Sequence, residues 1–353
     1  MSVAVPLDLT PVTVLTGFLG SGKTTLLNAL LRDERLRDTA VIINEFGEVG
    51  LDHLLVSESQ ENVVLLDSGC LCCTIGSGLS ETLETLFRQR REGSIPAFQR
   101  VVVETTGLAD PFPLLKTVLA DYFVSKHFTV NGVLTTVDAL HGLGQLREHV
   151  EARNQVAVAN HISITKSDVA DPAQVNELEA ALLQLNGAAQ LSFSFAGADA
   201  CRAAVEVVDF LTRAPERDLF EAGLDIEHAH GHDHSEHCEN DGGAGHFHHD
   251  ERIESFVFRW SRGATWQGYA SWLEQLGRLP ASDLMRVKGL LQLDGSGPPY
   301  VVQGVQHTFS KPVRMASWPT ADQQSWLVVI ARGLRRASLD AIFYSEQDQT
   351  ENT

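Results

Sequence analysis

A glycine-rich octapeptide near the amino terminus constrains this 353-residue chain more than any other feature. Residues 17–24 read GFLGSGKT, which matches the pattern G-x-x-x-x-G-K-[ST]. They follow a short apolar run, residues 12–16, and open a stretch with helical character, residues 23–32. The glycines of this motif let backbone N–H groups turn towards phosphate oxygens between a strand and a helix. The sequence therefore predicts a phosphate-binding loop.

Individual residues of the loop have distinct expected roles. Lys23 places a cation near the β and γ phosphates and is also expected to be catalytic, and the Thr24 hydroxyl is expected to bind Mg²⁺. A glycine-rich turn without a ligand is the plainer alternative, but the full pattern between a strand and a helix disfavours it. The expected nucleotide-binding residues of this region are Gly17, Gly20, Ser21, Gly22, Lys23, Thr24 and Thr25.

The charge balance narrows the set of partners. Lys and Arg number 27 against 46 Asp and Glu, so the formal net charge is -19. Nucleic acid and anionic membranes attract basic surfaces, so neither is an expected partner. No run approaches the roughly 18 apolar residues of a membrane helix, and the amino terminus does not resemble a secretion signal. We expect a soluble, cytoplasmic protein.

The first part of the chain alternates short apolar runs with amphipathic stretches. This rhythm is typical of a parallel sheet. It predicts an α/β class with helices on both faces of the sheet, and together with the phosphate-binding loop it predicts a P-loop NTPase domain over residues 1–220. The apolar runs are residues 12–16, 40–44, 63–67, 101–104, 130–137, 161–165 and 190–195, and helix-like segments include residues 79–91 and 175–185.

The composition changes abruptly after this domain. Residues 228–250 hold eight of the fourteen histidines, and we interpret residues 221–250 as a flexible linker. A smaller α+β domain is predicted over residues 251–345, followed by a disordered tail, residues 346–353. Trp260, Trp266 and Trp272 are expected in its core. Its expected strands are residues 253–260, 285–293, 300–305, 308–315 and 326–332, with a helix near residues 265–276.

Two further motifs concern the nucleotide. Residues 165–168 (TKSD) resemble the [NT]-K-x-D of guanine-binding proteins, in which the carboxylate, here Asp168, accepts hydrogen bonds from guanine and the stem of Lys166 covers the base. They can also be an ordinary helix start.

Residues 104–107 (ETTG) are expected to form a switch segment. In this segment Glu104 is expected to be catalytic and to reach Mg²⁺, and Gly107 is expected to donate to the γ-phosphate. The alternative is a strand that ends in a helical turn.

A cysteine cluster suggests a second kind of chemistry. Cys70, Cys72 and Cys73 are soft ligands that suit Zn²⁺ or Cu(I). A transferable metal site, a structural zinc and a redox pair all remain possible explanations. A structural zinc normally takes two separated ligand pairs, but Cys201 and Cys238 are isolated. An open or incomplete site is therefore favoured.

Other candidate ligands lie near the cysteines in the fold or elsewhere in the chain. Loops at the carboxyl ends of parallel strands share one edge, so Glu45 or Glu48 can complete the cysteine site. Glu48 can equally be a solvated surface charge. The histidine stretch suits capture of Zn²⁺, Ni²⁺ or Co²⁺, or is a solvated linker that binds metal adventitiously. Its auxiliary ligands are expected to be His228, His230, His232, His234 and His237.

Together these residues resemble the CobW family of GTP-dependent metallochaperones. The C-x-C-C cluster in a P-loop protein is the most discriminating element of the resemblance. Thr165 and Thr106 depart from it, where Asn and Ser are commoner. Matching segments are residues 17–24, 44–47 (NEFG), 70–73 (CLCC), 104–111 (ETTGLADP) and 165–168, the histidine stretch, and residues 286–289 (RVKG) with 302–305 (VQGV).

The resemblance implies a slow GTPase that converts GTP to GDP and phosphate with Mg²⁺. It implies that Cys70, Cys72 and Cys73 bind Zn²⁺ or Co²⁺ and pass it to a client metalloprotein. A homodimer that depends on nucleotide or metal is a further hypothesis. One alternative is a metal-buffering or metal-sensing GTPase that regulates a partner without delivering metal. A small-molecule kinase is another, but it leaves the cysteines unexplained.

Overall fold

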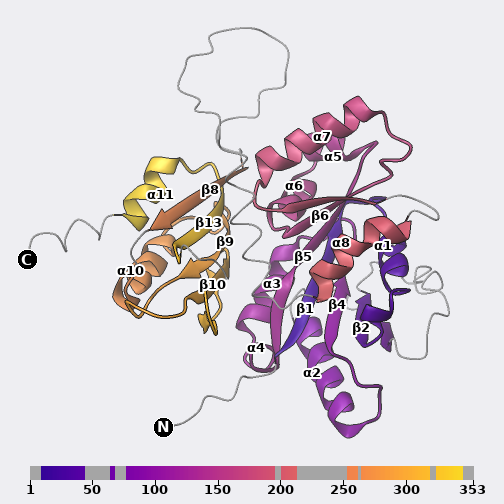
Figure 1. Cartoon of the computed structure of the whole chain (residues 1–353), viewed down its shortest axis with the longest axis horizontal. Coiled ribbons are helices and arrows are strands. Elements are labelled where there is room, and N and C mark those ends of the chain that lie inside the picture. Colours follow the sequence, from indigo (N-terminus) through magenta and orange to yellow (C-terminus); the bar gives the residue numbers. More distant parts are fainter. Residues whose placement is uncertain are drawn as a thin grey trace, which may run out of the picture. The chain divides into compact units, whose positions relative to one another are not determined.

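The computed structural model describes residues 9–43, 64–67, 77–194, 200–212, 253–260, 264–318 and 323–344. Two compact units make up the chain (Figure 1). The first runs from β1 to α8 and the second from β8 to α11, and each is described by itself. The expected linker, residues 221–250, and the expected tail, residues 346–353, lie outside the described residues.

A seven-stranded sheet forms the centre of the first unit. All its neighbouring strands are parallel, in the order β3-β2-β4-β1-β5-β6-β7. Each predicted apolar run is a strand of this sheet, with small differences at the ends. The strands are β1 (Thr10–Gly17), β2 (Thr39–Ile43), β3 (Val64–Asp67), β4 (Arg100–Glu104), β5 (Phe128–Asp138), β6 (His161–Thr165) and β7 (Gln190–Ser194).

Helices cover both faces of this sheet, as predicted (Figure 1). On one face, α1 and α8 pack in a core with Leu15, Val41 and Val102. On the other face, α3 and α6 pack against β1. Asp110 caps α3, and Pro111 occupies its first turn, where a missing N–H costs nothing. The helices are α1 (Lys23–Leu30), α2 (Ser77–Glu92), α3 (Pro111–Ala120), α4 (Val124–His127), α5 (Gly142–Glu148), α6 (Val150–Ala157), α7 (Pro172–Leu185) and α8 (Ala200–Thr212), with a 3₁₀ turn at Glu34–Leu36.

The strand register brings several strand ends to one level. Ile43, the last residue of β2, is paired with Asp67 at the end of β3 and with Glu104 at the end of β4. On the other side of β1, Asp138 at the end of β5 is paired with Thr165 at the end of β6. The loops that follow these strands therefore begin at a common edge, which is where open α/β sheets bind ligands.

In its described residues, the second unit is an antiparallel sheet with two helices. Its strands follow the order β11-β10-β9-β13-β8, and β12 pairs separately with β10. Residues 286–289 and 302–305 lie side by side in β9 and β10, where Gly289 is paired with Val302. The elements are β8 (Ile253–Trp260), α10 (Trp266–Leu276), β9 (Leu284–Leu291), β10 (Tyr300–Val305), β11 (Thr308–Phe309), β12 (Val313–Arg314), β13 (Ser325–Arg332) and α11 (Arg336–Phe343).

Tryptophan placement in this unit differs from the prediction at one position. Trp260 and Trp272 are each 4% exposed and stack with ring centroids 5.1 Å apart, in a core that α10 and α11 complete. Trp266 is 44% exposed, so its assignment to the core is wrong. It is the first residue of α10, and its indole N–H donates to Asp294 at 2.7 Å. An indole at a helix end can bury one edge and keep its N–H bonded at the surface.

The predicted strand over residues 308–315 is two short strands instead. β11 forms a hairpin with the end of β10, where Gly304 pairs with Phe309, and β12 pairs with its start, where Tyr300 pairs with Arg314. Pro312 lies between them and has no N–H to offer a neighbouring strand. The ladder is therefore interrupted at this point.

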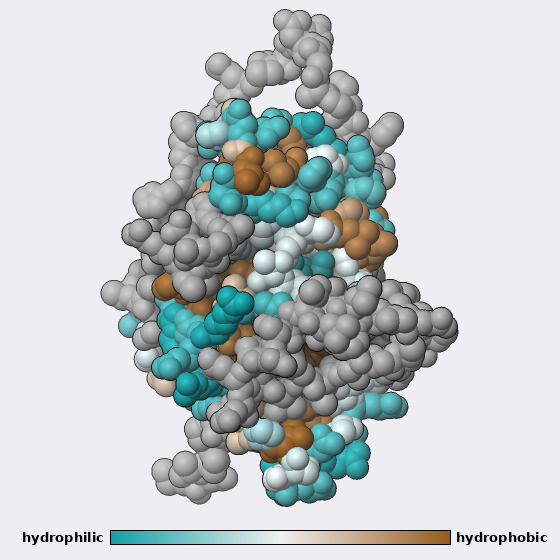
Figure 2. Space-filling model, turned by 90° about the vertical axis from the view of Figure 1, so that its right-hand side faces the viewer, coloured by the Kyte–Doolittle hydropathy of each residue, from teal (hydrophilic) through white to brown (hydrophobic). Residues whose placement is uncertain are grey.

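Among the described residues, no helix combines the length and apolar character that a membrane crossing requires. On the face of the molecule drawn in Figure 2, hydrophilic residues predominate in the described part, and the apolar residues lie in separate groups. Exposed apolar side chains of the first unit include Leu19 and Leu108, which belong to loops at the carboxyl edge of the sheet.

Candidate nucleotide site

The phosphate-binding loop joins the end of β1 to the start of α1. Gly17, Gly20 and Gly22 have φ angles of 142°, 73° and 88°, a region that L side chains disfavour. Gly22 is the amino-terminal cap residue of α1, so the first N–H groups of this helix have no partner within it. The loop thus presents backbone donors and the positive end of a helix dipole to an anion.

Gly17 is the most confined residue of the loop. A Cβ added there would lie 2.3 Å from Thr136 Oγ1 and 2.4 Å from the Thr136 carbonyl oxygen. β1 and β5 run side by side at this point, with Gly17 paired with Thr136. The first glycine of the motif is therefore required by packing as well as by its backbone angle.

Hydrogen bonds of buried hydroxyl groups connect the loop and the strand before it to the rest of the sheet. Ser21 Oγ and Thr136 Oγ1 lie 2.6 Å apart, and both residues are at most 1% exposed. Thr165 Oγ1 donates to the Ser21 carbonyl oxygen at 2.8 Å, which connects the loop to β6. Thr105 Oγ1 donates to Thr16 Oγ1 at 2.9 Å, which connects β1 to the end of β4. The first two bonds fix the loop to β5 and β6, and the third fixes the end of β1, from which the loop starts, to the end of β4.

The two expected catalytic residues lie at the ends of this loop and of β4. Lys23 Nζ donates to the carbonyl oxygens of Gly17 at 2.9 Å and Phe18 at 3.3 Å, so its ammonium lies against the loop. Thr24 Oγ1 donates to Glu104 Oε1 at 2.7 Å, and Glu104 is 5% exposed. Adjacent hydroxyl and carboxylate oxygens are ligands that suit Mg²⁺. The structure brings Thr24 and Glu104 together as the sequence predicts.

The predicted switch segment, residues 104–107, contacts the loop directly. The Thr105 N–H donates to the Leu15 carbonyl oxygen at 2.9 Å, which extends the pairing of β4 with β1. A Cβ at Gly107 would lie 2.7 Å from Leu19 N and 2.8 Å from Leu19 Cα. A glycine is therefore needed at this position for the segment to approach the loop so closely.

The guanine motif is linked to the loop through its lysine. Lys166 Nζ donates to the Gly20 carbonyl oxygen at 2.9 Å and to Asp138 Oδ2 at 2.7 Å. Lys166 has a φ of 58°, which is uncommon for a residue other than glycine. Asp168 is exposed after β6, and Thr25 is exposed on the first turn of α1.

Asp138 is a site residue that no motif indicated. Its side chain is only 3% exposed. Burial acts to raise the pKa of the Asp138 carboxyl, but hydrogen bonds from Lys166, the Leu140 N–H and the His141 ring outweigh it and hold the pKa below its usual value. The carboxylate is thus ionised at neutral pH and holds Lys166 over the loop. Its place at the end of β5 is the signal that could have identified it.

Asp138→Asn is expected to weaken GTP and GDP binding by about 5-fold, because Lys166 loses a charged partner. A 5-fold change in affinity corresponds to about 1 kcal/mol. The expected effect is this small because the Lys166 side chain is 40% exposed and solvent screens its ion pair with Asp138. Nucleotide titration calorimetry measures it. Asp209→Asn is the matched control, because Asp209 of α8 forms an exposed ion pair with Arg35 of the 3₁₀ turn. Equal effects of the two substitutions would contradict this role.

The predicted metal ligands cannot be located in the same way. Cys70, Cys72, Cys73, Glu45 and Glu48 lie outside the described residues, as do the five auxiliary histidines, His228 to His237. Within the ranges that the structure describes, no group of three or more His, Cys, Asp or Glu side chains is arranged to hold a metal ion.

Comparison with known families accounts for both units. The family described as CobW/HypB/UreG, nucleotide-binding domain, matches residues 11–193. The chain belongs to the CobW family. Residues 253–345 match the family described as the cobalamin synthesis protein cobW C-terminal domain, so the second unit also has its counterpart in CobW proteins.

Curated relatives extend over nearly the whole chain. Zinc chaperone YjiA of Escherichia coli is 30% identical over 331 residues, which are 92% of this chain and 94% of the relative. Zinc chaperone CobW of Pseudomonas aeruginosa is 28% identical over 362 residues, with 93% and 89% covered. The crystal structure of the Zn(II)-bound YjiA GTPase superimposes with a TM-score of 0.63 at 27% identity and covers 96% of this chain and 98% of that one. This CobW-family chain is a GTPase, as predicted.

Proposed function

We propose that this GTPase is a metallochaperone that binds Zn²⁺ through Cys70, Cys72 and Cys73 and delivers it to a client metalloprotein under the control of GTP. Co²⁺ is the second metal that such a site would take. Two relatives carry the name zinc chaperone, and a relative from Schizosaccharomyces pombe, 32% identical over 52% of this chain, is named a zinc-regulated GTPase metalloprotein activator. These names support zinc as the cargo.

The proposal rests mainly on the register of the sheet, in which β2, β3 and β4 end at the same position along the strand direction. Ile43 is paired with both Asp67 and Glu104, and Cys70 is only three residues beyond Asp67 in the chain. Neighbouring strands lie about 4.8 Å apart, so the end of β3 is about 10 Å from the end of β4. A short loop spans such a distance. This supports a cysteine site adjacent to the nucleotide, with Glu45 or Glu48 from the loop after β2 as additional ligands.

The residues around the loop suit GTP hydrolysis with Mg²⁺. Backbone N–H groups of the loop and Lys23 would hold the phosphates, and Thr24 with Glu104 would hold the metal ion. Mg²⁺ supplies positive charge at the β and γ phosphates when it is bound. Lys166 and Asp168 would bind guanine, and Gly107 would approach the γ-phosphate. The position of these residues near the carboxyl edge of the sheet supports each of these roles.

Coupling between the two sites would pass through the segments that border both. GTP would order the loops after β2, β3 and β4 and change the metal affinity of the cysteines, and hydrolysis would relax them. The auxiliary histidines would capture metal and raise its local supply. The histidine stretch also favours a second candidate function, in which the chain buffers or senses metal and regulates a partner without delivering it.

A transfer assay distinguishes these functions. The zinc-loaded chain is mixed with an apo-metalloenzyme in the presence of GTP, GDP or a non-hydrolysable GTP analogue. We expect enzyme activity to recover fastest with GTP. Recovery that is equal in all three mixtures would contradict nucleotide control, and zinc retention without recovery would favour buffering. The molar mass of the chain in the same mixtures tests the homodimer hypothesis.

Cys72→Ser tests the site itself. We expect the zinc affinity to fall at least about 10-fold, because a hydroxyl is a much poorer zinc ligand than a thiolate. Competition with a zinc-binding dye measures it, and Cys201→Ser is the matched control because Cys201 belongs to α8 and not to the cluster. A zinc affinity that stays the same in Cys72→Ser would remove this residue from the site.

A further inference from the structure

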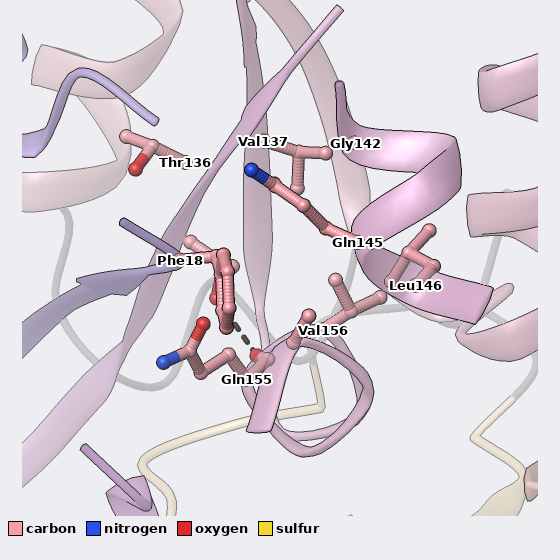
Figure 3. A pocket seen from close by; sticks show the side chains of 10 residues that line it. Phe18, Thr136, Val137, Gly142, Gln145, Leu146, Gln155 and Val156 are labelled. Atoms are coloured by element: carbon pink, nitrogen blue, oxygen red, sulfur yellow. Dashed lines mark hydrogen bonds between the residues drawn. The ribbon is translucent and has the colours of Figure 1, made fainter. Parts of the chain in front are cut away.

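Gln155 is a buried polar residue that the nucleotide site does not yet explain. It lies in α6, is 1% exposed, and borders a small cavity beside the phosphate-binding loop. Figure 3 draws this cavity, with Phe18 on one side and Leu146 and Val156 on the other. The Gln155 carbonyl oxygen accepts a hydrogen bond from Thr135 Oγ1 at 2.9 Å, which ties this turn of α6 to β5.

The side-chain amide of Gln155 points to the last residue of the predicted switch segment and to the residues just after it. Its Nε2 donates to the carbonyl oxygens of Gly107 and Ala109, each at 3.1 Å. The two N–H groups of the amide thus match two carbonyl oxygens. The opposite orientation would place Oε1 against both carbonyl oxygens, so the contacts themselves define which atom is the nitrogen. Oε1 is buried and has no hydrogen-bond partner among the described residues.

The segment that Gln155 contacts is otherwise held mainly at its two ends. The Thr105 N–H is bonded to β1 at one end, and Asp110 caps α3 at the other, where it accepts from the Phe112 N–H at 3.1 Å. Between these ends, the Leu108 side chain is 55% exposed and adds little packing. Gly107 meanwhile lies against Leu19 of the loop. The Gln155 amide therefore adds two hydrogen bonds to the backbone at the centre of this segment, next to the contact of Gly107 with Leu19.

We propose that Gln155 is a positioning residue for GTP hydrolysis, whose amide holds residues 107–109 closed against the phosphate-binding loop. The inference rests on the proposed role of residues 104–107 as the switch. Gln155 belongs to α6, which is hydrogen-bonded to β5, so its amide can hold the segment while α6 stays in place as nucleotide binds. Holding Gly107 in place favours the state that recognises a γ-phosphate. GDP has no γ-phosphate, so its binding does not depend on the Gln155 amide.

The test compares nucleotide affinities and turnover in Gln155→Leu, which keeps the size of the side chain and removes both donors. We expect kcat to fall about 10-fold and the affinity for a non-hydrolysable GTP analogue to fall by a similar factor, since two hydrogen bonds are lost. The affinity for GDP should stay within about 2-fold of the wild type. The ratio of the two affinities is therefore the decisive readout.

Asn131→Leu is the matched control. Asn131 is a 4% exposed amide of β5 that donates to Thr13 Oγ1 at 3.1 Å and to the Phe210 carbonyl oxygen at 3.4 Å, away from the switch segment. Its substitution also removes two buried hydrogen bonds, so it should lower Tm and leave the affinity ratio unchanged. A structural role alone would make Gln155→Leu behave in the same way, and that result would overturn the proposal.

A second variant covers the case in which Gln155→Leu does not fold. Gln155→Met has an unbranched side chain of similar length, which adapts to a tight site, and should show the same change in the affinity ratio. An unchanged ratio in folded Gln155→Met would equally overturn the proposal. The readout uses no zinc. If the zinc affinity of the wild type were the same with every nucleotide, the proposed coupling would be contradicted. The result for Gln155 would not be affected, because it is measured without zinc.

Discussion

Lys23→Ala is expected to reduce the rate of GTP hydrolysis about 100- to 1000-fold, the usual cost of losing a charged donor that stabilises a transition state. Lys23 Nζ lies against the loop, within 2.9 Å of the Gly17 carbonyl oxygen and 3.3 Å of the Phe18 carbonyl oxygen. When the backbone N–H groups hold the phosphates of GTP, the Lys23 ammonium would be drawn towards the oxygens of the β and γ phosphates. Release of phosphate under single-turnover conditions measures the loss.

Lys126→Ala is the control for this substitution. Lys126 is an exposed residue of α4, just before β5 begins, and so lies at the opposite edge of the sheet from the nucleotide site. It should hydrolyse GTP at the wild-type rate. Turnover that persists in Lys23→Ala would mean that residues 17–24 do not act as a phosphate-binding loop.

Gly17→Ala is expected to destabilise the first unit by about 3 kcal/mol and to abolish nucleotide binding. The added methyl group would lie 2.3 Å from Thr136 Oγ1, and Thr136 is held in place by Ser21 and by the sheet. Backbone atoms of β5 cannot move away cheaply, because they are paired with β1. Urea unfolding and nucleotide titration measure the two effects.

Gly20→Ala separates the steric effect from the effect of the backbone angle. Gly20 has a φ of 73°, but a Cβ there would meet no atom within 4 Å. The free energy of unfolding of Gly20→Ala should therefore fall by only about 1–2 kcal/mol, the cost of a left-handed conformation for alanine. If Gly17→Ala proved no less stable than Gly20→Ala, the close packing of the loop against β5 would be contradicted.

The architecture of the first unit followed from its sequence because β1, β2, β4, β5 and β6 are buried along nearly their whole length. Such strands read as short apolar runs, and the runs predicted seven strands that the structure contains. The second unit was less predictable, since its sheet is antiparallel and its edge is interrupted. Pro312 divides β11 from β12, and this depends on the partner strand rather than on local propensity.

The site was predictable where a motif or a strand end marked it. Thr24 and Glu104 are distant in the chain, and their 2.7 Å contact was expected from the loop and switch patterns. Asp138 could have been found by the same strand-end argument. Gln155 could not, because a glutamine within a helix gives no local signal, and its role depends on how α6 packs beside the end of β4.

We propose above all that the nucleotide and metal sites are thermodynamically coupled. It is supported by the register that ends β2, β3 and β4 at one level, with the cysteine cluster in the loop after β3. Coupling is reciprocal, so zinc must change the affinity for GTP by the same factor as GTP changes the affinity for zinc. Typical coupled sites differ by about 5- to 150-fold.

The most direct test is a zinc titration of the wild-type chain with GDP, with a non-hydrolysable GTP analogue and without nucleotide. We expect the zinc dissociation constant to differ at least about 5-fold between the GDP and GTP-analogue states, and we expect this difference to disappear in Cys72→Ser. The same dissociation constant in all three conditions would contradict the proposed coupling and leave a GTPase whose cysteines do not respond to the nucleotide.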